Sequence, residues 1–274
     1  MVETEAAGIL HSQLRLLCVL AHPDDESLGM GGTLARCAAE GIETYLVTAT
    51  RGERGRFGDA AEKPAPEVVG MVREAELKAA AKELGVREVA ILGYPDGGLD
   101  ACDPLEVQTE IAGHIRRVRP QVVVTFGPEG AYGHPDHIAI CQMATAAVVC
   151  AADPDCGGPG HRVSKLYYMA WRKEKWDAYQ AALRTLRVMV DGVERLAAPW
   201  PDWAVTTVVE TNDLWPAVWR AVSCHKTQMA IYKTLEHLPG EQHRAIWGSQ
   251  EYYRVFSAVN GGRKIETDLF EGLR

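Results

Sequence analysis

The sequence lacks an excess of positive charge. Its 274 residues carry 29 Lys and Arg against 37 Asp and Glu, a formal net charge of -8 at pH 7. Binding to a nucleic-acid backbone depends on clustered Lys and Arg, so this balance disfavours nucleic acid as the main partner. The chain also lacks an apolar run of about 18 residues, which is the length that crosses a membrane. We therefore expect neither nucleic-acid binding nor membrane insertion.

Several other signatures are missing. The seven cysteines are odd in number, widely spread and contain no Cys-x-x-Cys pair, which is typical of a reducing compartment. Cys150 and Cys156 could form a metal pair, but free cysteine is more commonly a small buried residue. The chain begins Met-Val-Glu-Thr-Glu, with acids where a secretory signal would carry Lys or Arg. These features predict a soluble cytoplasmic protein.

The first part of the chain alternates short apolar runs with longer helical patterns. Nearly continuous apolar or β-branched runs, typical of strands covered on both faces, occupy residues 14–21, 44–48, 89–92 and 122–126. Between them, apolar residues recur at helical spacing in residues 28–40, 68–84 and 104–118. This series predicts a Rossmann-like α/β fold with a doubly wound, mainly parallel sheet, helices on both faces, and ligands at the carboxyl ends of the strands.

The composition changes near residue 151. Residues 153–160 form a turn-rich connector, and 15 of the 20 Phe, Trp and Tyr residues lie beyond position 150. Further strands are expected at 165–171 and 204–210, and a helix at 214–226. The aromatic excess suits a core, a subunit interface in a homo-oligomer, or a wall that stacks on sugars.

No internal repeat or polar linker divides the chain. With 47% hydrophobic and 24% charged residues, its composition is that of an ordinary globular protein. We predict one domain over residues 1–274, with a Rossmann-like core at about 14–152 and an aromatic-rich C-terminal elaboration at about 153–274.

A histidine and three consecutive acids follow the first predicted strand. They form the segment Ala-His-Pro-Asp-Asp-Glu at residues 21–26. Acids this close repel one another unless they share a cation or a proton, and a divalent metal ion would remove the repulsion. Neighbouring side chains in an extended segment point in opposite directions, so Asp24 and Asp25 are expected to perform different tasks. Capping of the next helix is the structural alternative. The glycine run at 29–32 lacks the spacing of a dinucleotide site, so we expect no NAD.

A second polar segment follows the fourth predicted strand. It runs from Tyr132 through His134-Pro-Asp-His137 into the apolar helix predicted at 138–150. Proline suits the first helical position, which makes His134 the predicted N-cap and places His137 in the first turn.

Both polar segments lie at carboxyl ends of parallel strands, so they should meet at one edge of the sheet. His22, Asp25 and His137 can then converge on one ion. Two histidines and one carboxylate leave coordination positions open, which fits a catalytic zinc with a bound water. The same ligands also fit the facial triad of non-haem iron.

Six segments together resemble the LmbE-like, or PIG-L, deacetylase family. They are Ala-His-Pro-Asp-Asp-Glu at 21–26, Thr-Ala-Thr-Arg-Gly-Glu at 48–53, Arg-Glu-Ala-Glu-Leu at 73–77, Tyr-Pro-Asp-Gly at 94–97, His-Pro-Asp-His at 134–137 and His-Lys-Thr-Gln at 225–228. That family includes N-acetylglucosaminyl-phosphatidylinositol de-N-acetylase and the mycothiol and bacillithiol pathway deacetylases. The residues beyond 230 match no motif.

The resemblance implies zinc-dependent hydrolysis of an N-acyl group, commonly the acetyl group of an N-acetylglucosamine conjugate, with one Zn²⁺ per chain and Fe²⁺ or another divalent ion as an alternative. It implies the following roles: His22, Asp25 and His137 bind the metal; Asp24 is the general base; a protonated His134 is the acid or oxyanion stabiliser; Asp136 orients His134; Tyr132 assists at the tetrahedral centre; Arg73 and Asp96 hold substrate hydroxyls; and Arg51 helps to select the substrate.

Three alternative functions remain open at this point. One is an amidase that acts on a thiol-sugar conjugate, one is a non-haem iron enzyme, and one is a sugar-binding module without catalysis. The iron enzyme would not need Asp24 beside its metal. Every expected catalytic position carries a competent residue type, which disfavours the silent module. In each case the expected partner is a small molecule.

Overall fold

The structure, a computed structural model, describes residues 13–60, 62–183, 185–262 and 264–274. Residues 1–5, on which the prediction about a secretory signal rests, lie outside these ranges. The described strands form a seven-stranded sheet in the order β3-β2-β1-β4-β5-β9-β8 and a separate pair, β6-β7. Their bounds are β1 Arg15–Leu20, β2 Glu43–Thr50, β3 Glu88–Tyr94, β4 Val122–Thr125, β5 Lys165–Met169, β6 Arg187–Val190, β7 Val193–Leu196, β8 Thr207–Glu210 and β9 Ser249–Ser257.

The centre of the sheet is parallel. β1 pairs in parallel with β2 and β4, and these continue to β3 and β5. Leu16 to Leu20 of β1 are completely buried, as expected for a central strand with both faces covered. β9 then runs antiparallel between β5 and β8. The predicted mainly parallel α/β sheet is confirmed.

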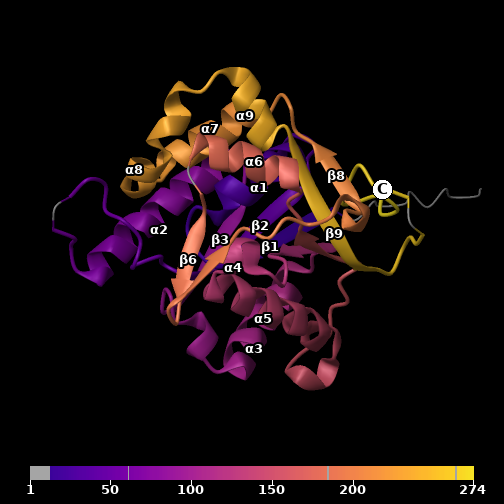
Figure 1. Ribbon diagram of the computed structural model, residues 1–274. Coiled ribbons are helices and arrows are strands. Elements are labelled where there is room, and N and C mark those ends of the chain that lie inside the picture. Colours follow the sequence, from indigo (N-terminus) through magenta and orange to yellow (C-terminus); the bar gives the residue numbers. More distant parts are fainter. Residues whose placement is uncertain (1–12, 61, 184, 263) are drawn as a thin grey trace, which may run out of the picture.

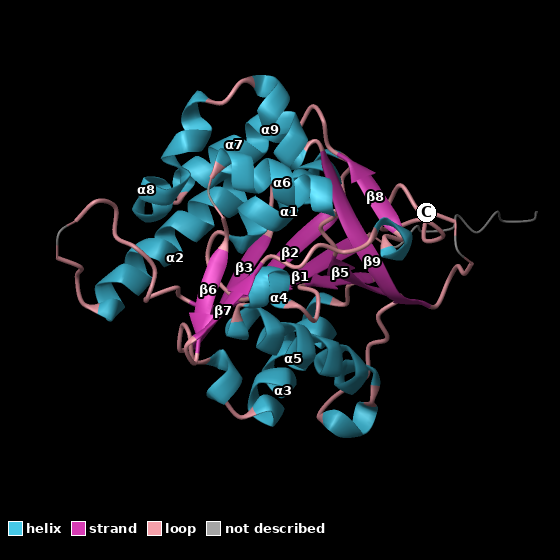
Figure 2. Cartoon of the chain, viewed as in Figure 1, coloured by secondary structure: helices cyan, strands magenta, loops and turns pink. Residues whose placement is uncertain are grey.

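Helices cover both faces of this sheet (Figures 1 and 2). α1 and α2 lie with α7 on one face, whereas α3 and α5 pack together on the other. The α-helices are α1 Asp25–Ala39, α2 Pro66–Glu83, α3 Pro104–Val118, α4 Gly130–Gly133, α5 Pro135–Ala152, α6 Lys173–Ala182, α7 Trp215–Cys224, α8 Met229–Tyr232 and α9 Gly240–Trp247. This two-sided winding brings the carboxyl ends of β1 to β4 to one edge.

α5 is the only helix in the described part of the chain with the length and apolar composition to cross a membrane. Of its 18 residues, 56% are buried inside the molecule. It packs against α3 and against β1 and β4. Burial of this kind is expected of a helix in a protein core.

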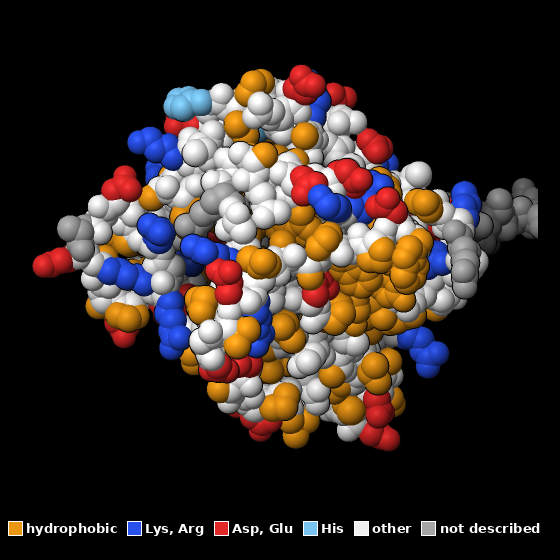
Figure 3. Space-filling view, in the orientation of Figure 1, with side chains coloured by type: hydrophobic (Ala, Val, Ile, Leu, Met, Phe, Trp, Pro, Cys, Tyr) orange, Lys and Arg blue, Asp and Glu red, His pale blue; other side chains and the backbone are white. Residues whose placement is uncertain are grey.

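Some aromatic residues beyond position 150 lie in the core, and others are partly buried on neighbouring strands. Trp176, Trp247, Tyr167 and Tyr252 are among the largest fully buried side chains. Tyr168 of β5 and Tyr253 of β9 stack on each other. Figure 3 shows hydrophobic side chains gathered at the surface over β9. The C-terminal part thus extends the sheet and its core through β5, β8 and β9.

Candidate active site

A pocket of about 370 Å³ opens at the carboxyl edge of the sheet. The polar segments that follow β1, β2, β3 and β4 contribute to its wall, and so do α6 and α8. Its lining residues are His22, Asp24, Asp25, Leu28, Gly29, Arg54, Gly55, Arg73, Asp96, Gly97, Phe126, Ala131, Tyr132, His134, His137, Trp171, Tyr179, Leu183, Leu186, Gln228, Ile231 and Tyr232.

His22, Asp25 and His137 form a triangle of donor atoms in this pocket. His22 Nδ1 lies 3.2 Å from His137 Nε2 and 3.7 Å from Asp25 Oδ2. His137 Nε2 lies 3.5 Å from Asp25 Oδ1. A tetrahedral ion with ligand bonds of about 2.0–2.2 Å separates its ligand atoms by roughly 3.3–3.6 Å. The two histidine nitrogens are close to this spacing, and Asp25 faces each of them through a different carboxylate oxygen. Two nitrogens and one carboxylate are ligand types that suit zinc.

The other ring nitrogen of His22 faces two buried carboxylates. His22 Nε2 lies 3.0 Å from Asp136 Oδ2 and 3.2 Å from Asp96 Oδ1. The Asp136 carboxylate also accepts the backbone N–H groups of Gly97 and Leu99. In the neutral form of the ring, a proton on Nε2 satisfies this contact and leaves the Nδ1 lone pair for a metal ion.

Two other groups of donors share His22. One combines it with His134 and His137, and the other with Asp96 and Asp136; in each, the donor atoms lie within 4.8 Å of one another. Asp96 and Asp136 face Nε2 of His22, whereas His137 and Asp25 face its Nδ1. The two acids at Nε2 can therefore orient the ring while Nδ1 faces an ion together with His137 and Asp25.

Burial and charge set the protonation of this triangle. Although burial opposes the charged form, hydrogen bonds to Asp136 and Asp96 raise the pKa of His22 to about 10. Burial raises the pKa of Asp25 to about 7 despite the neighbouring His22. Burial and the charge of His22 lower the pKa of His137 well below its ordinary value, so that His137 is neutral, as a metal ligand must be.

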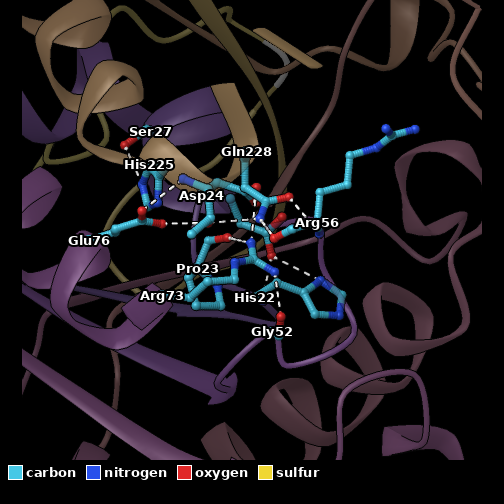
Figure 4. A network of polar contacts seen from close by, with 12 residues as sticks. His22, Pro23, Asp24, Ser27, Gly52, Arg56, Arg73, Glu76, His225 and Gln228 are labelled. Atoms are coloured by element: carbon cyan, nitrogen blue, oxygen red, sulfur yellow. Dashed lines mark hydrogen bonds and ion pairs between the residues drawn. The ribbon is translucent and has the colours of Figure 1, made fainter. Parts of the chain in front are cut away.

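Asp24 makes contacts different from those of Asp25, but its backbone is not extended as the sequence prediction assumed. Its backbone has φ 103°, a left-handed conformation that costs a non-glycine residue about 1–3 kcal/mol. Asp24 Oδ2 accepts hydrogen bonds from Arg73 Nη2 at 3.1 Å and from Tyr232 Oη at 2.9 Å (Figure 4 shows Asp24 and Arg73). Arg73 also donates to the carbonyl of Pro23. The strained backbone is thus held from within the pocket.

His134 is the predicted N-cap of α5. Its Nδ1 accepts the backbone N–H of Asp136 at 3.2 Å, which confirms the cap. Because Nδ1 is the acceptor, Nε2 is the nitrogen left to carry the proton of the neutral ring. Tyr132 lines the pocket with its ring edge toward the ring of His134, and the two ring centroids are 5.9 Å apart.

The expected role of His134 requires a protonated ring, whereas its surroundings in the structure favour the neutral ring. Burial and the charge of His22 lower the pKa of His134 to about 4, although the charge of Asp136 acts in the opposite direction. The neutral ring is then the main form at pH 7. The resemblance implies that the Asp136 side chain orients His134. In the structure this side chain contacts His22, and the backbone N–H of Asp136 is the group that donates to His134.

The three predicted substrate-binding residues differ in position. Arg73 and Asp96 line the pocket, but both are buried, and their hydrogen bonds go to Asp24, to backbone atoms and to His22. Arg51 does not line this pocket. It pairs with Glu74 at 3.0 Å, and its side chain is 49% exposed.

Sequence reasoning allowed for an aromatic wall from the C-terminal region but named none of the residues that this region adds to the pocket. Trp171 and Tyr179 stack with their ring centroids 5.3 Å apart and line the pocket. Tyr232 lies in the segment that matches no motif. His225 belongs to a recognised motif, but that motif carried no assigned role. These residues lie far from the first two polar segments in sequence, so only the fold shows that they belong to the site.

Comparisons with known proteins agree on one family. The profile of the PIG-L family, described as GlcNAc-PI de-N-acetylase, matches residues 17–148. The 1D-myo-inositol 2-acetamido-2-deoxy-alpha-D-glucopyranoside deacetylase of Rhodococcus jostii (strain RHA1) is 37% identical over 299 residues, which cover 96% of this chain and 99% of that protein. The protein of the same name from Kineococcus radiotolerans is 34% identical over 302 residues, covering 94% and 83% of the two chains.

Solved structures share the fold. A conserved protein from Thermus thermophilus superposes with a TM-score of 0.64 at 28% identity, covering 91% of this chain and 98% of that one. The N,N'-diacetylchitobiose deacetylase of Pyrococcus horikoshii superposes with a TM-score of 0.66 at 21% identity, covering 89% and 84% of the two chains.

Proposed function

Because the chain belongs to the PIG-L family, we propose that it is a metal-dependent hydrolase that removes an N-acetyl group from an N-acetylglucosamine conjugate. The observation that carries this proposal is the triangle of His22, Asp25 and His137 beside Asp24 in one pocket. The two relatives named above are deacetylases of a 2-acetamido-2-deoxy-glucopyranoside of inositol, which favours deacetylation over an amidase reaction.

His22, Asp25 and His137 are the residues that would hold the metal, and zinc is the ion proposed. A zinc ion would supply an activated water at neutral pH and polarise the acyl carbonyl. His22 is oriented for this task by Asp136 and Asp96, which occupy its second nitrogen. Fe²⁺ is the alternative that the same ligand types allow.

Asp24 is the proposed general base. Amide hydrolysis needs a group that removes a proton from the attacking water, and a carboxylate beside the metal ligands can do so. His134 is proposed to donate a hydrogen bond from Nε2 to the developing oxyanion, because its Nδ1 is already occupied by the helix cap. Tyr132 lies next to it and would contact the same oxygen or its neighbour.

The walls of the pocket suit a sugar. Arg73 and Asp96 line the pocket with charged groups, and Trp171 lines it with an aromatic ring. An aromatic face against one side of a pyranose, with polar groups around its hydroxyls, is a usual arrangement for small-molecule sites. The proposed partner is thus a small N-acetylated amino sugar, and a cytoplasmic location and a homo-oligomer remain predictions.

A substrate screen tests the proposal. Zinc-loaded protein is incubated with N-acetylglucosamine, its 1-O-inositol glycoside and N,N'-diacetylchitobiose, and the released amine and acetate are both measured. Stoichiometric release of acetate and amine from at least one glycoside is expected, with and without oxygen. A requirement for oxygen would favour the iron enzyme, and binding without release would favour the silent sugar-binding module.

A further inference from the structure

The general-base candidate Asp24 is held by two donors that come from different parts of the chain. Arg73 lies on α2, and Tyr232 is the last residue of α8. Both donate to the same atom, Asp24 Oδ2, at 3.1 and 2.9 Å. Neither hydrogen bond goes to Oδ1. The two donors therefore fix the rotation of the carboxylate. They leave Oδ1 as the oxygen that accepts the proton.

Tyr232 is suited to donate. Its side chain is buried and lines the pocket. Burial and the negative charge of Asp24 raise the pKa of Tyr232 well above its ordinary value, so the hydroxyl keeps its proton. A neutral hydroxyl adds a hydrogen bond to a carboxylate without adding charge to the pocket.

The segment before Tyr232 is fastened at several points (Figure 4). His225 Nε2 lies 2.8 Å from Glu26 Oε1, which ties the end of α7 to the start of α1. Thr227 donates its backbone N–H and its hydroxyl to Glu76 on α2, at 2.8 and 2.7 Å. Gln228 exchanges hydrogen bonds with the backbone N–H and carbonyl of Arg56.

These anchors explain the motif at 225–228. Glu26 also accepts the backbone N–H of Asp24 at 2.9 Å, so one carboxylate contacts both the strained residue and the anchor of α8. Because all three anchors precede α8 directly, they determine where the Tyr232 hydroxyl lies. The motif thus has a task in the site although it contributes neither a metal ligand nor a base.

We propose that Tyr232, placed by the anchored segment 225–228, is a positioning residue that acts with Arg73 to orient the Asp24 carboxylate for proton transfer. The inference rests on the proposed function, in which Asp24 is the base. Its consequence is that the C-terminal part of the chain completes a catalytic group supplied by the N-terminal part.

Replacement of one hydroxyl tests this inference. Tyr232→Phe is compared with Tyr252→Phe, a matched control, because Tyr252 is also buried and its hydroxyl lies 2.6 Å from Thr33 Oγ1, outside the pocket lining. Tyr232→Phe should lower kcat about 10- to 100-fold, the scale of a lost hydrogen bond to a charged group, with KM and bound metal unchanged within twofold. Tyr252→Phe should change kcat less than twofold.

A double-mutant cycle shows whether the effect passes through Asp24. In an Asp24→Asn background, Tyr232→Phe should lower kcat by less than a further twofold, because the base that it positions is already gone. An equal loss in both backgrounds, an unchanged kcat in the single variant, or a Tyr232→Phe protein whose thermal unfolding shows that it does not fold would each overturn the inference. An inactive wild-type protein would instead overturn the proposed function on which it rests.

Discussion

Two buried groups of charged side chains lie at opposite ends of the same sheet. At the amino ends of β5 and β8, the Glu266 carboxylate accepts hydrogen bonds from five side chains: Lys165, Tyr167, Thr207, Arg254 and Asn260. At the carboxyl ends of β1 and β4, acids and histidines crowd around one pocket. Burial alone does not distinguish these groups, since Lys165 and Glu266 are as buried as His137.

The two groups differ in how completely hydrogen bonds and opposite charges stabilise the ionised carboxylate. Although burial opposes ionisation, hydrogen bonds from Lys165 and Tyr167 lower the pKa of Glu266 to about 2. Burial raises the pKa of Asp25 to about 7 in spite of the charge of His22. Five side chains donate hydrogen bonds to the Glu266 carboxylate, whereas the hydrogen bonds to Asp25 come from the backbone N–H groups of Ala21 and His22. A buried acid whose pKa is raised although a charged histidine lies beside it is the better sign of a functional site.

The largest expected effect is the loss of the metal ion. His137→Ala removes one of three ligands, so the bound ion should fall from about one per chain to none, with loss of deacetylation. Elemental analysis of the purified protein measures it. Chelation should lower the thermal stability of the wild-type protein but not of the variant, because only the former binds the ion. Unchanged metal content in His137→Ala would contradict the ligand set.

The next effect separates Asp24 from the metal ligands. Asp24→Asn should retain the ion and lower kcat by about 10²–10⁴, the usual contribution of a positioned base. Steady-state kinetics with metal analysis on the same sample measures both. A variant that turns over near the wild-type rate at saturating zinc would exclude Asp24 as the base.

Sequence patterns predicted the parts of this comparison that depend on local order. The parallel strands and the crossover helices follow from periodicities that are visible within short windows. The prediction for Asp24 and Asp25 assumed an extended backbone, whereas Asp24 has a left-handed conformation and Asp25 begins α1. The predicted helix at 104–118 coincides with α3, Pro104–Val118. The same reasoning also placed His134 at the start of α5.

Sequence patterns could not predict the contacts between segments that are distant in sequence. β9 pairs with β5 across many residues, and no local pattern states which strand an antiparallel partner will join. Likewise, Asp136 lies next to His134 in sequence, but its carboxylate is turned toward His22, over a hundred residues earlier. Tyr232 and the Glu266 group escaped prediction for the same reason.

A smaller effect is expected at Glu266 and its five donors. Glu266→Gln leaves the buried charges of Lys165 and Arg254 without their anion, which should lower the free energy of unfolding by about 3–5 kcal/mol at pH 7. Glu88→Gln is the control, since its pair with Arg117 is exposed and should contribute less than about 1 kcal/mol. Urea unfolding measures both. Metal content and kcat of the folded Glu266→Gln protein should not change. A loss of metal would show that the Glu266 group is not independent of the metal site.

The smallest effect is the pH dependence of that difference. The pKa of Glu266 in the folded protein is about 2, below its ordinary value of 4.5, so the folded state binds this proton more weakly than the unfolded state does. The stability that the ionised carboxylate contributes is therefore present above about pH 4.5 and is lost as the pH falls toward 2. The gap in unfolding free energy between wild type and Glu266→Gln should accordingly narrow by up to about 3 kcal/mol between pH 5 and pH 2. Urea unfolding across that range measures the gap. A gap that stays constant would mean that Glu266 is protonated alike in both states and that its five donors do not hold it ionised, which would remove the contrast with Asp25.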